Sequence, residues 1–388
     1  MTWFAVVVLC VCACGRFGFA AGGDGSDGAV DGESVDGITV CASGVTFAPR
    51  VDYPTETRPY STKAVDLDND THLDLAVVAW SVGTINVLRG RGDGTFDPFV
   101  SYPSGTEPQN LVVAKVTADA APDIVVANRG TQNMAVFRNN GDGTFAPRVN
   151  YNLGAVGPHQ PAVADLDGDG DLDTAVSIPN GSRVQLMLND GTGVFAAGPL
   201  YSAPTYPLGI AAGDLEPDGD VDLVVAKQLG AAVAVMVNDG SGLFPTGSQI
   251  ATPNDPNSAA LADMDGDGLL DVVVSSVSNN TVSIARNLGN ATFTAVISYP
   301  AGPGSDELAV VDLDGDGDLD VVVANPGVHT IGVMWNDGTG ALGAPTTFPV
   351  GNAPYGVTVA DLDHDGHLDA IVSNVLDDTI SVLRGTCQ

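Results

Sequence analysis

The chain carries the same acidic loop seven times, at a nearly constant interval. The fullest copy, D-L-D-G-D-G-D-L-D, runs from Asp165 to Asp173. The copies begin at Asp66, Lys115, Asp165, Asp214, Asp263, Asp312 and Asp361, in steps of 49, 50, 49, 49, 49 and 49 residues. So regular a period predicts that one supersecondary unit is copied and stacked into a single closed body over residues 45–388.

Each repeat contains four short apolar segments separated by turn residues. In the third copy they lie at 161–165, 174–178, 184–188 and 194–201. Runs this short, bounded by Gly, Asn, Asp or Pro, are typical of strands, and residues 45–388 show no helical period. The second segment is apolar throughout, as in V-V-V-A at 321–324, so we expect it to be covered on both faces. The sequence therefore predicts an all-β protein whose four-stranded antiparallel sheets form the blades of a ring.

The two ends of the repeat array are expected to close this ring. The last repeat stops after its third strand, whereas T-F-A-P-R-V-D-Y at 46–53 matches the fourth strand T-F-A-P-R-V-N-Y at 144–151. The N-terminal strand should therefore complete the last blade. Superposition on the hairpin at 85–96 places Cys41 and Cys387 in the same tight turn, which predicts a disulfide that stabilises the fold by about 4–5 kcal/mol.

An aromatic residue recurs near the end of the fourth strand. At strand spacing in successive copies, we interpret this row as packing between blades rather than as a carbohydrate platform. Its members are Tyr53, Tyr102, Tyr151, Tyr201, Tyr299 and Phe348, with Ile250 as the exception.

The acidic loops have the composition of calcium sites. In D-x-D-x-D-G-x-x-D, positions 1, 3, 5 and 9 supply carboxylate oxygens, position 7 supplies a carbonyl, and the Gly at position 6 permits a sharp turn. Ligands that are all oxygen suit Ca²⁺ better than Zn²⁺ or Mg²⁺. We expect about six Ca²⁺ ions, one per blade except the second. The predicted ligands are Asp66, Asp68, Asp70 and Asp74; Asp165, Asp167, Asp169 and Asp173; Asp214, Glu216, Asp218 and Asp222; Asp263, Asp265, Asp267 and Asp271; Asp312, Asp314, Asp316 and Asp320; and Asp361, Asp363, Asp365 and Asp369.

Two copies depart from this pattern. The first has Thr71 in place of the position 6 Gly, so we expect its site to be weaker. The second has Lys115 and Thr117 at positions 1 and 3. Our hypothesis is that the Lys115 ammonium replaces the missing ion; the alternative is that this repeat has decayed and Lys115 is exposed.

The composition and the N-terminal segment indicate where the protein is located and which partners it can bind. A formal net charge of −34 argues against nucleic acid as a partner. Residues 1–20 are predicted to be a signal peptide with a lipobox, V-C-A-C-G, that makes Cys14 the lipidated residue. The alternative is cleavage near Ala20 and ordinary secretion. Residues 21–44 are expected to be a flexible acidic, Gly-rich linker. Either way the protein is expected to be exported, to the cell envelope with a lipid anchor as its only membrane attachment, or to the medium.

The repeat resembles the FG-GAP/VCBS-type family, to which the N-terminal propellers of integrin α-subunits belong. The resemblance covers about 45–388 and depends on the acidic loop and on the turn G-D-G-T-F at 92–96 and 141–145. It implies a seven-bladed β-propeller with calcium between the first and second strands. It also implies adhesion or ligand binding rather than a shared reaction, and the N-terminus is similar to that of a bacterial lipoprotein.

Strand direction alternates within a blade, so the acidic loops lie on one face and the 2–3 and 4–1 connections on the other. We expect a monomer that binds a protein or polysaccharide partner on this second face and is not an enzyme. The alternative is a polysaccharide-binding lectin or a lyase built on the same fold. Candidate contact residues on that face are Tyr60, Trp80, Gln109, Asn110, Arg129, His159, Tyr206, Asn257, Asp306, His329 and Tyr355.

Overall fold

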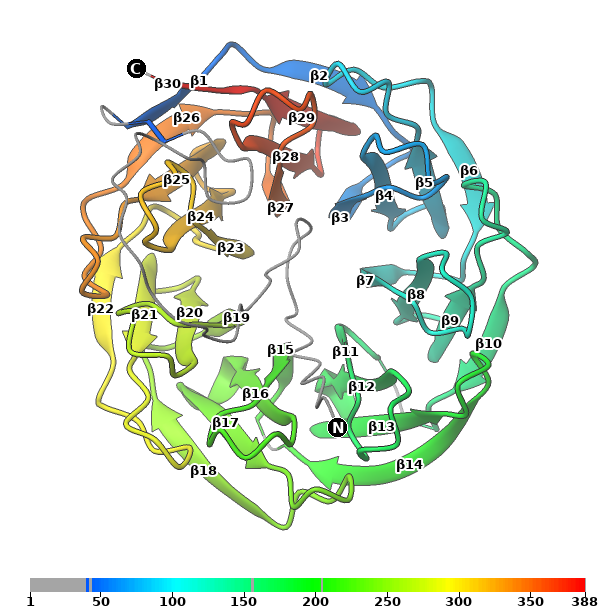
Figure 1. Cartoon of the computed structure of the whole chain (residues 1–388), viewed down its shortest axis with the longest axis vertical. Helices are drawn as coiled ribbons and strands as arrows, with labels where there is room; N and C mark the ends of the chain where they lie inside the picture. Colours follow the sequence, from blue (N-terminus) through cyan, green and yellow to red (C-terminus); the bar gives the residue numbers. More distant parts are fainter. Residues whose placement is uncertain (1–39, 42–43, 155–156, 204, 388) are drawn as a thin grey trace, which may run out of the picture.

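The computed structural model describes residues 40–41, 44–154, 157–203 and 205–387. The expected signal peptide at 1–20, with Cys14, and most of the linker at 21–44 lie outside these residues. Seven four-stranded antiparallel sheets stand around a central axis, with the first strand of each innermost (Figure 1). The fold is the all-β, seven-bladed propeller that the repeat predicts.

Six blades are continuous in sequence. Blade 1 is β3 (Pro59–Val65), β4 (Asp74–Ala79), β5 (Thr84–Leu88) and β6 (Val100–Pro103). Blade 2 is β7 (Pro108–Ala114), β8 (Asp123–Asn128), β9 (Asn133–Phe137) and β10 (Val149–Asn152). Blade 3 is β11 (Pro161–Ala164), β12 (Asp173–Ile178), β13 (Arg183–Asn189) and β14 (Phe195–Ser202). Blade 4 is β15 (Pro207–Gly213), β16 (Asp222–Lys227), β17 (Ala232–Val237) and β18 (Thr246–Ala251). Blade 5 is β19 (Pro256–Ala262), β20 (Asp271–Ser276), β21 (Thr281–Ala285) and β22 (Ile297–Pro300). Blade 6 is β23 (Leu308–Val311), β24 (Asp320–Asn325), β25 (Thr330–Met334) and β26 (Thr346–Pro349).

Blade 7 joins the two ends of the chain. It consists of β27 (Pro354–Ala360), β28 (Asp369–Asn374), β29 (Thr379–Leu383) and the N-terminal strand β2 (Val51–Pro54), which pairs with β29. Beside it, β1 (Val45–Phe47) pairs with β30 (Gly385–Cys387). Cys41 and Cys387 form the expected disulfide, with their Cα atoms 5.1 Å apart. The ring is thus closed by strand pairing and by a covalent bond.

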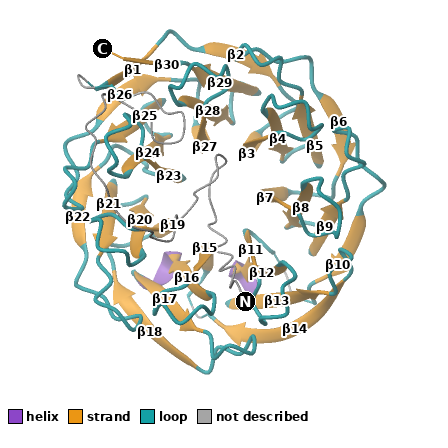
Figure 2. Cartoon of the chain, in the orientation of Figure 1, coloured by secondary structure: helices purple, strands orange, loops and turns teal. Residues whose placement is uncertain are grey.

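Strands account for nearly all the regular structure (Figure 2). The only helical elements among the described residues are the short 3-10 turns η2 (Pro179–Gly181) and η3 (Gln228–Gly230), each after the second strand of its blade. None of the described segments is a helix long and apolar enough to cross a bilayer.

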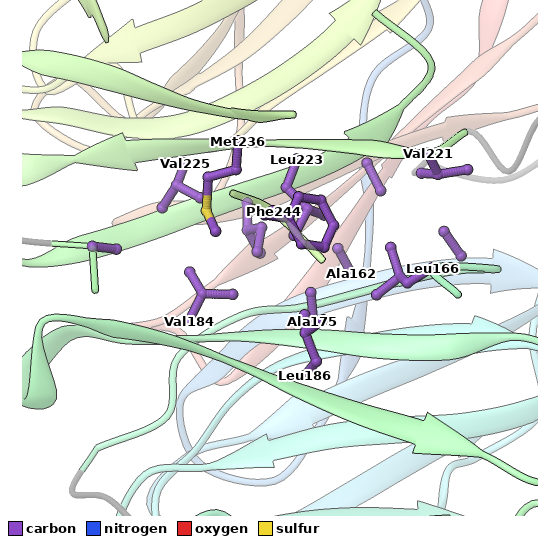
Figure 3. Close-up of a cluster of buried hydrophobic side chains, with 14 residues drawn as sticks. Ala162, Leu166, Ala175, Val184, Leu186, Val221, Leu223, Val225, Met236 and Phe244 are labelled. Carbon is purple, nitrogen blue, oxygen red and sulfur yellow. The ribbon is translucent and has the colours of Figure 1, made fainter. Parts of the chain in front are cut away.

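The core lies between blades rather than within them. Every second strand is buried along its whole length, as its continuous apolar sequence predicts. Seven apolar clusters fill the seven gaps between neighbouring blades. Figure 3 shows one, in which Leu186 of blade 3 faces Leu223 and Phe244 of blade 4. Each blade is therefore covered on both faces by its neighbours, which explains why apolar side chains occupy both faces of its strands.

The fourth-strand aromatics pack between blades, as predicted. The Tyr201 ring contacts Phe244 of the next blade edge to face, at 5.4 Å between ring centroids. Three further tyrosines and Phe348 make the same kind of contact. The Tyr201 hydroxyl also donates a hydrogen bond to the carbonyl of Gly242, and Tyr151 and Tyr299 donate equivalent bonds, so the aromatic row ties three of the outer strands to the turn of the next blade.

Candidate metal loops and the axial pocket

Each acidic loop joins the innermost strand of a blade to its second strand. Position 1 directly follows the first strand, and position 9 is the first residue of the second. Position 2 is apolar and buried in every copy, as at Leu166 and Met264, which are both 1% exposed. This buried residue anchors the loop, while positions 1, 3 and 5 curl over it.

The aspartate at position 9 is held rigidly by the backbone. Asp173 is fully buried, and its two carboxylate oxygens accept hydrogen bonds from the backbone N–H groups of Leu166 (3.1 Å) and Asn189 (2.7 Å). The same pair of bonds occurs in all six loops that match the calcium pattern. Because a carboxylate has about four acceptor sites, each of these residues keeps acceptor capacity for a further partner.

Loop backbone groups orient positions 1 and 5 in a similar way. The carboxylate of Asp165 accepts hydrogen bonds from the N–H groups of Gly168 and Gly170, and that of Asp169 accepts one from Asp171. The acidic side chains are therefore turned inward, toward the loop that carries them.

The predicted ligands converge in at least four of the six loops. In each of these, one oxygen from each of three predicted ligands lies within 4.8 Å of the other two. The groups are Asp66, Asp68 and Asp70; Asp165, Asp167 and Asp173; Asp263, Asp265 and Asp271; and Asp312, Asp314 and Asp316. The set at Asp214 has a longer side chain, Glu216, at position 3.

Several of these oxygens are buried without a hydrogen-bond partner. At position 3, one carboxylate oxygen of Asp68, Asp167, Asp265 and Asp363 is enclosed and makes no hydrogen bond within the described residues. Asp361, at position 1 of the last loop, has another such oxygen. Burying a carboxylate oxygen without a hydrogen-bond partner is unfavourable unless a bound cation takes the place of that partner. The donor set therefore fits a hard, oxygen-binding cation.

The electrostatics of position 9 agree with this fit. Burial raises the pKa of Asp173 and Asp222 to about 7 and that of Asp320 to about 8, and the backbone hydrogen bonds offset only part of the effect. The same cause raises the pKa of Asp74 and Asp271 to about 6 and that of Asp369 to about 7. Without a cation, the charged form of these groups is disfavoured.

The second loop corrects one hypothesis. Lys115 is exposed and forms no ion pair within the described residues, so it does not take the place of the ion. The Thr117 hydroxyl instead donates a hydrogen bond of 2.9 Å to Asp123. A neutral donor, rather than an ammonium group, satisfies the buried carboxylate in this copy.

Thr71 shows why the first loop differs. It has a φ of 76°, whereas the glycines at the same position in other loops have φ between 86° and 96°. A β-branched residue in this left-handed region is strained. The loop keeps its shape at the expense of backbone strain.

Sequence reasoning missed a set of arginines that link the loops to neighbouring blades. Arg286 forms an ion pair with Asp265 at position 3 (3.1 Å), and its other terminal nitrogen donates to the carbonyl of Thr339 in the next blade. Arg89 and Arg384 do the same with Asp68 and Asp363. The sequence does contain a signal for this set, because Arg recurs directly after the third strand, at positions 89, 138, 286 and 384.

On the opposite face, the blades enclose a cavity of about 300 Å³ on the ring axis, which we call the axial pocket. Nine of the eleven candidate contact residues line it; Trp80 and His329 do not. One lining position recurs in every blade, at or just before the start of the innermost strand, and we call this set the axial ring: Tyr60, Gln109, His159, Leu208, Asn257, Asp306 and Tyr355. Glu307, Gln160 and Gln228 also line the pocket and were not predicted.

Burial shifts the pKa of several ionisable groups in this pocket, including Tyr60, Glu307 and Tyr355, each of which has a raised pKa. It raises the pKa of Asp306 to about 8 and lowers the pKa of His159 to about 4. His159 is therefore neutral at physiological pH, and Asp306 holds a proton more readily than an ordinary carboxyl group.

Solved structures of other proteins share this architecture. Selenomethionine-substituted virginiamycin B lyase from Staphylococcus aureus matches with a TM-score of 0.62 at 13% identity, over 87% of this chain and 99% of the lyase. BBS1N in complex with ARL6DN matches at 0.62 and 15% identity, over 87% and 96%. An Agrocybe aegerita lectin that recognises non-reducing terminal N-acetylglucosamine matches at 0.57 and 20% identity, over 88% and 98%. At these identities the likeness establishes the fold alone.

No curated protein matches the sequence significantly. The FG-GAP-like repeat model matches residues 66–126, 115–176, 217–274, 263–323 and 312–372, which together make up more than half of the chain. Its matches include six of the seven acidic loops in full and the loop at 214–222 from residue 217 onward. The chain belongs to the FG-GAP-like repeat family.

Proposed function

We propose that this chain is an exported, calcium-binding β-propeller that acts as a binding or adhesion module for a protein or glycan partner. The observation that carries the calcium assignment is the row of buried position 3 oxygens without a hydrogen-bond partner in Asp68, Asp167, Asp265 and Asp363. Position 9 is already fixed by two backbone N–H groups, so an ion completes a site that needs little rearrangement.

Calcium has a mechanical role in this proposal. Each loop fixes the end of an innermost strand, and the other end of that strand carries an axial ring residue. Neutralising the loop acids holds the strand ends together and keeps the far face rigid. Extracellular calcium sites bind at about 10⁻⁴–10⁻³ M, so a millimolar environment would fill them.

Export fits the covalent closure of the ring. The Cys41–Cys387 disulfide persists in an oxidising compartment, such as the periplasm or the cell exterior. We propose a lipid anchor at Cys14 as the attachment to the envelope, with simple secretion as the alternative.

We propose binding rather than catalysis. Shared architecture with a lyase at 13% identity says nothing of a reaction on this chain. BBS1N with its protein partner and the lectin with its sugar both illustrate propellers that bind. A lectin is the second candidate function, because the axial pocket combines tyrosines with several amide side chains.

Calcium titration of the exported protein tests this proposal. Isothermal titration calorimetry should count about six sites, and Asp167→Asn should remove one of them. Asp171→Asn is the matched control, because Asp171 lies in the same loop at position 7, which contributes its backbone carbonyl. Pull-down of the envelope partner should weaken in EDTA and recover with calcium. If calcium neither binds nor alters the melting temperature, the metal assignment is wrong.

A further inference from the structure

The axial ring is where the seven repeats differ most. The acidic loops repeat nearly the same residues, whereas the axial ring presents three aromatic or aliphatic side chains, two amides, one imidazole and one carboxyl group in a single cavity. A purely architectural position would repeat as the loops do. The variety is what a site needs to recognise one asymmetric small ligand.

One side of the axial pocket is an aromatic stack. Tyr355 and Tyr60, from neighbouring blades, lie 5.0 Å apart between ring centroids at 33°, and Trp80 stacks behind Tyr60 at 6.1 Å and 30°. The Arg58 guanidinium lies 5.3 Å from the centre of the Trp80 ring and covers it. The two pocket tyrosines are thus held from behind, and their hydroxyls make no hydrogen bond among the residues that the structure describes. Because Tyr60 lies between Trp80 and Tyr355, the apolar ring surface open to a ligand is that of Tyr355, and both tyrosines offer free polar ends.

The other sides carry hydrogen-bonding groups already fixed in place. The Asn257 amide donates to Asp306, which orients the carboxyl group. The Nδ1 atom of His159 is buried and has no partner among the described residues. Gln109 is 6% exposed and lines the same cavity. These groups supply both donors and acceptors.

The lining of the axial pocket carries little charge of its own. Glu307 pairs with Lys63 at 3.4 Å, with side-chain exposures of 19% and 14%. Besides the neutral His159, the remaining lining residues with an acidic or basic side chain are Arg129 and Asp306. Burial raises the pKa of Asp306 to about 8, so its carboxyl group is mostly protonated at neutral pH. In a chain with a net charge of −34, a lining with so little net charge distinguishes this pocket from the acidic loops. It favours an uncharged ligand over phosphate, a polycation or an acidic polymer.

We infer that the axial pocket binds the terminal residue of a neutral glycan. A pyranose ring has apolar C–H faces for the tyrosine stack and hydroxyls for Asn257, Asp306 and His159. The volume of about 300 Å³ is at the low end for ligand pockets, which span roughly 300–1,000 Å³. Since all seven blades surround the cavity, a chain enters end-on and cannot lie across it. This inference deepens the proposed function and rests on it.

Binding of the calcium-loaded, full exported chain to immobilised oligosaccharides provides the test. The probes carry neutral hexose, N-acetylhexosamine, amino-sugar or uronate termini, and free methyl glycosides serve as competitors. We expect binding to neutral termini, weakened at least about tenfold in Tyr355→Ala and in Asp306→Ala. Tyr355→Phe should retain much of the affinity, because the ring remains for stacking. Leu376→Ala is the matched control, an exposed apolar residue on the same face outside the pocket.

Binding to native envelope preparations distinguishes a failure of the pocket inference from a failure of the proposed binding function. If the wild type binds envelopes and the two alanine variants bind equally well, the pocket inference is wrong and the binding-module function stands. A preference for uronate or amino-sugar termini would contradict a neutral ligand, and envelope binding that survives enzymatic deglycosylation would make the partner a protein. Failure of the wild type to bind any envelope or probe would overturn both. Unchanged melting temperature and calcium stoichiometry show that each variant is folded.

Discussion

At the scale of single residues, the six candidate metal loops fall into two classes. In blades 1, 5 and 7 an arginine pairs with the position 3 aspartate. In blades 3, 4 and 6 the equivalent residue is Leu188, Val237 or Trp335, which brings no charge. Affinity for calcium rises with the net negative charge of the ligand set. The loops without arginine should therefore be the tighter sites.

This difference predicts the effect of Arg286→Met. Removing the Arg286 guanidinium from Asp265 should make calcium bind the blade 5 site roughly fivefold more tightly, since a partly exposed ion pair contributes about 1 kcal/mol. Calcium titration calorimetry at low salt should then show four tight sites instead of three. Arg138→Met is the control: it also loses a hydrogen bond to the next blade, through Gly193, but its loop has no complete ligand set. Equal affinities before and after Arg286→Met would rule out the two-class view.

At the scale of strands and loops, the sequence predicts the features that every repeat contains. It does not predict the pocket that residues of different repeats form together. The four strands of each blade, the acidic loops and the closing strand all follow from the 49-residue period, because each copy of the repeat supports the reading of the others. The axial pocket is assembled from residues of all seven blades, on the innermost strands and in the loops beside them, so the sequence indicates the face but not which side chains meet. Lys115 was misjudged for a similar reason. Its position in the motif suggested a charge pair, but the residue that donates a hydrogen bond to Asp123 is Thr117.

The closing hairpin permits a prediction at this scale. Cys41 and Cys387 are separated by 346 residues, and such a crosslink restricts the unfolded chain strongly. We expect Cys41→Ser with Cys387→Ser to lower the free energy of unfolding by about 5 kcal/mol in urea, measured with calcium present. The ring should still form, because β2 pairs with β29 and an apolar cluster joins blades 7 and 1. Wild-type protein under reducing conditions should lose the same stability as the double variant. A decrease in the free energy of unfolding below about 1 kcal/mol would mean that strand pairing alone closes the ring.

At the scale of the whole molecule, we expect burial and charge to make the stability of the fold depend jointly on pH and on the proposed calcium ions. Six aspartates at position 9 have a pKa raised by burial to values from about 6 to about 8. A carboxyl group whose pKa is higher in the folded state than in the unfolded state, where it is about 3.9, stabilises the fold below that lower value. This contribution is lost as the pH rises through the folded pKa. The metal-free ring should therefore weaken between about pH 5 and about pH 8.

Calcium should reverse this trend, because it binds the charged form that burial disfavours. We expect the melting temperature in EDTA to fall from about pH 5 to about pH 8, while about 5 mM calcium adds little at the lower pH and most at the higher. At tenfold over its dissociation constant, each ion contributes about 1.4 kcal/mol, so six sites act strongly together. Magnesium at equal ionic strength controls for screening of the net charge of −34, and its demand for octahedral geometry should make it a poor substitute. A metal-free melting temperature that is flat or rises over this range, or magnesium acting as well as calcium, would show that these loops do not hold the ring together as calcium sites.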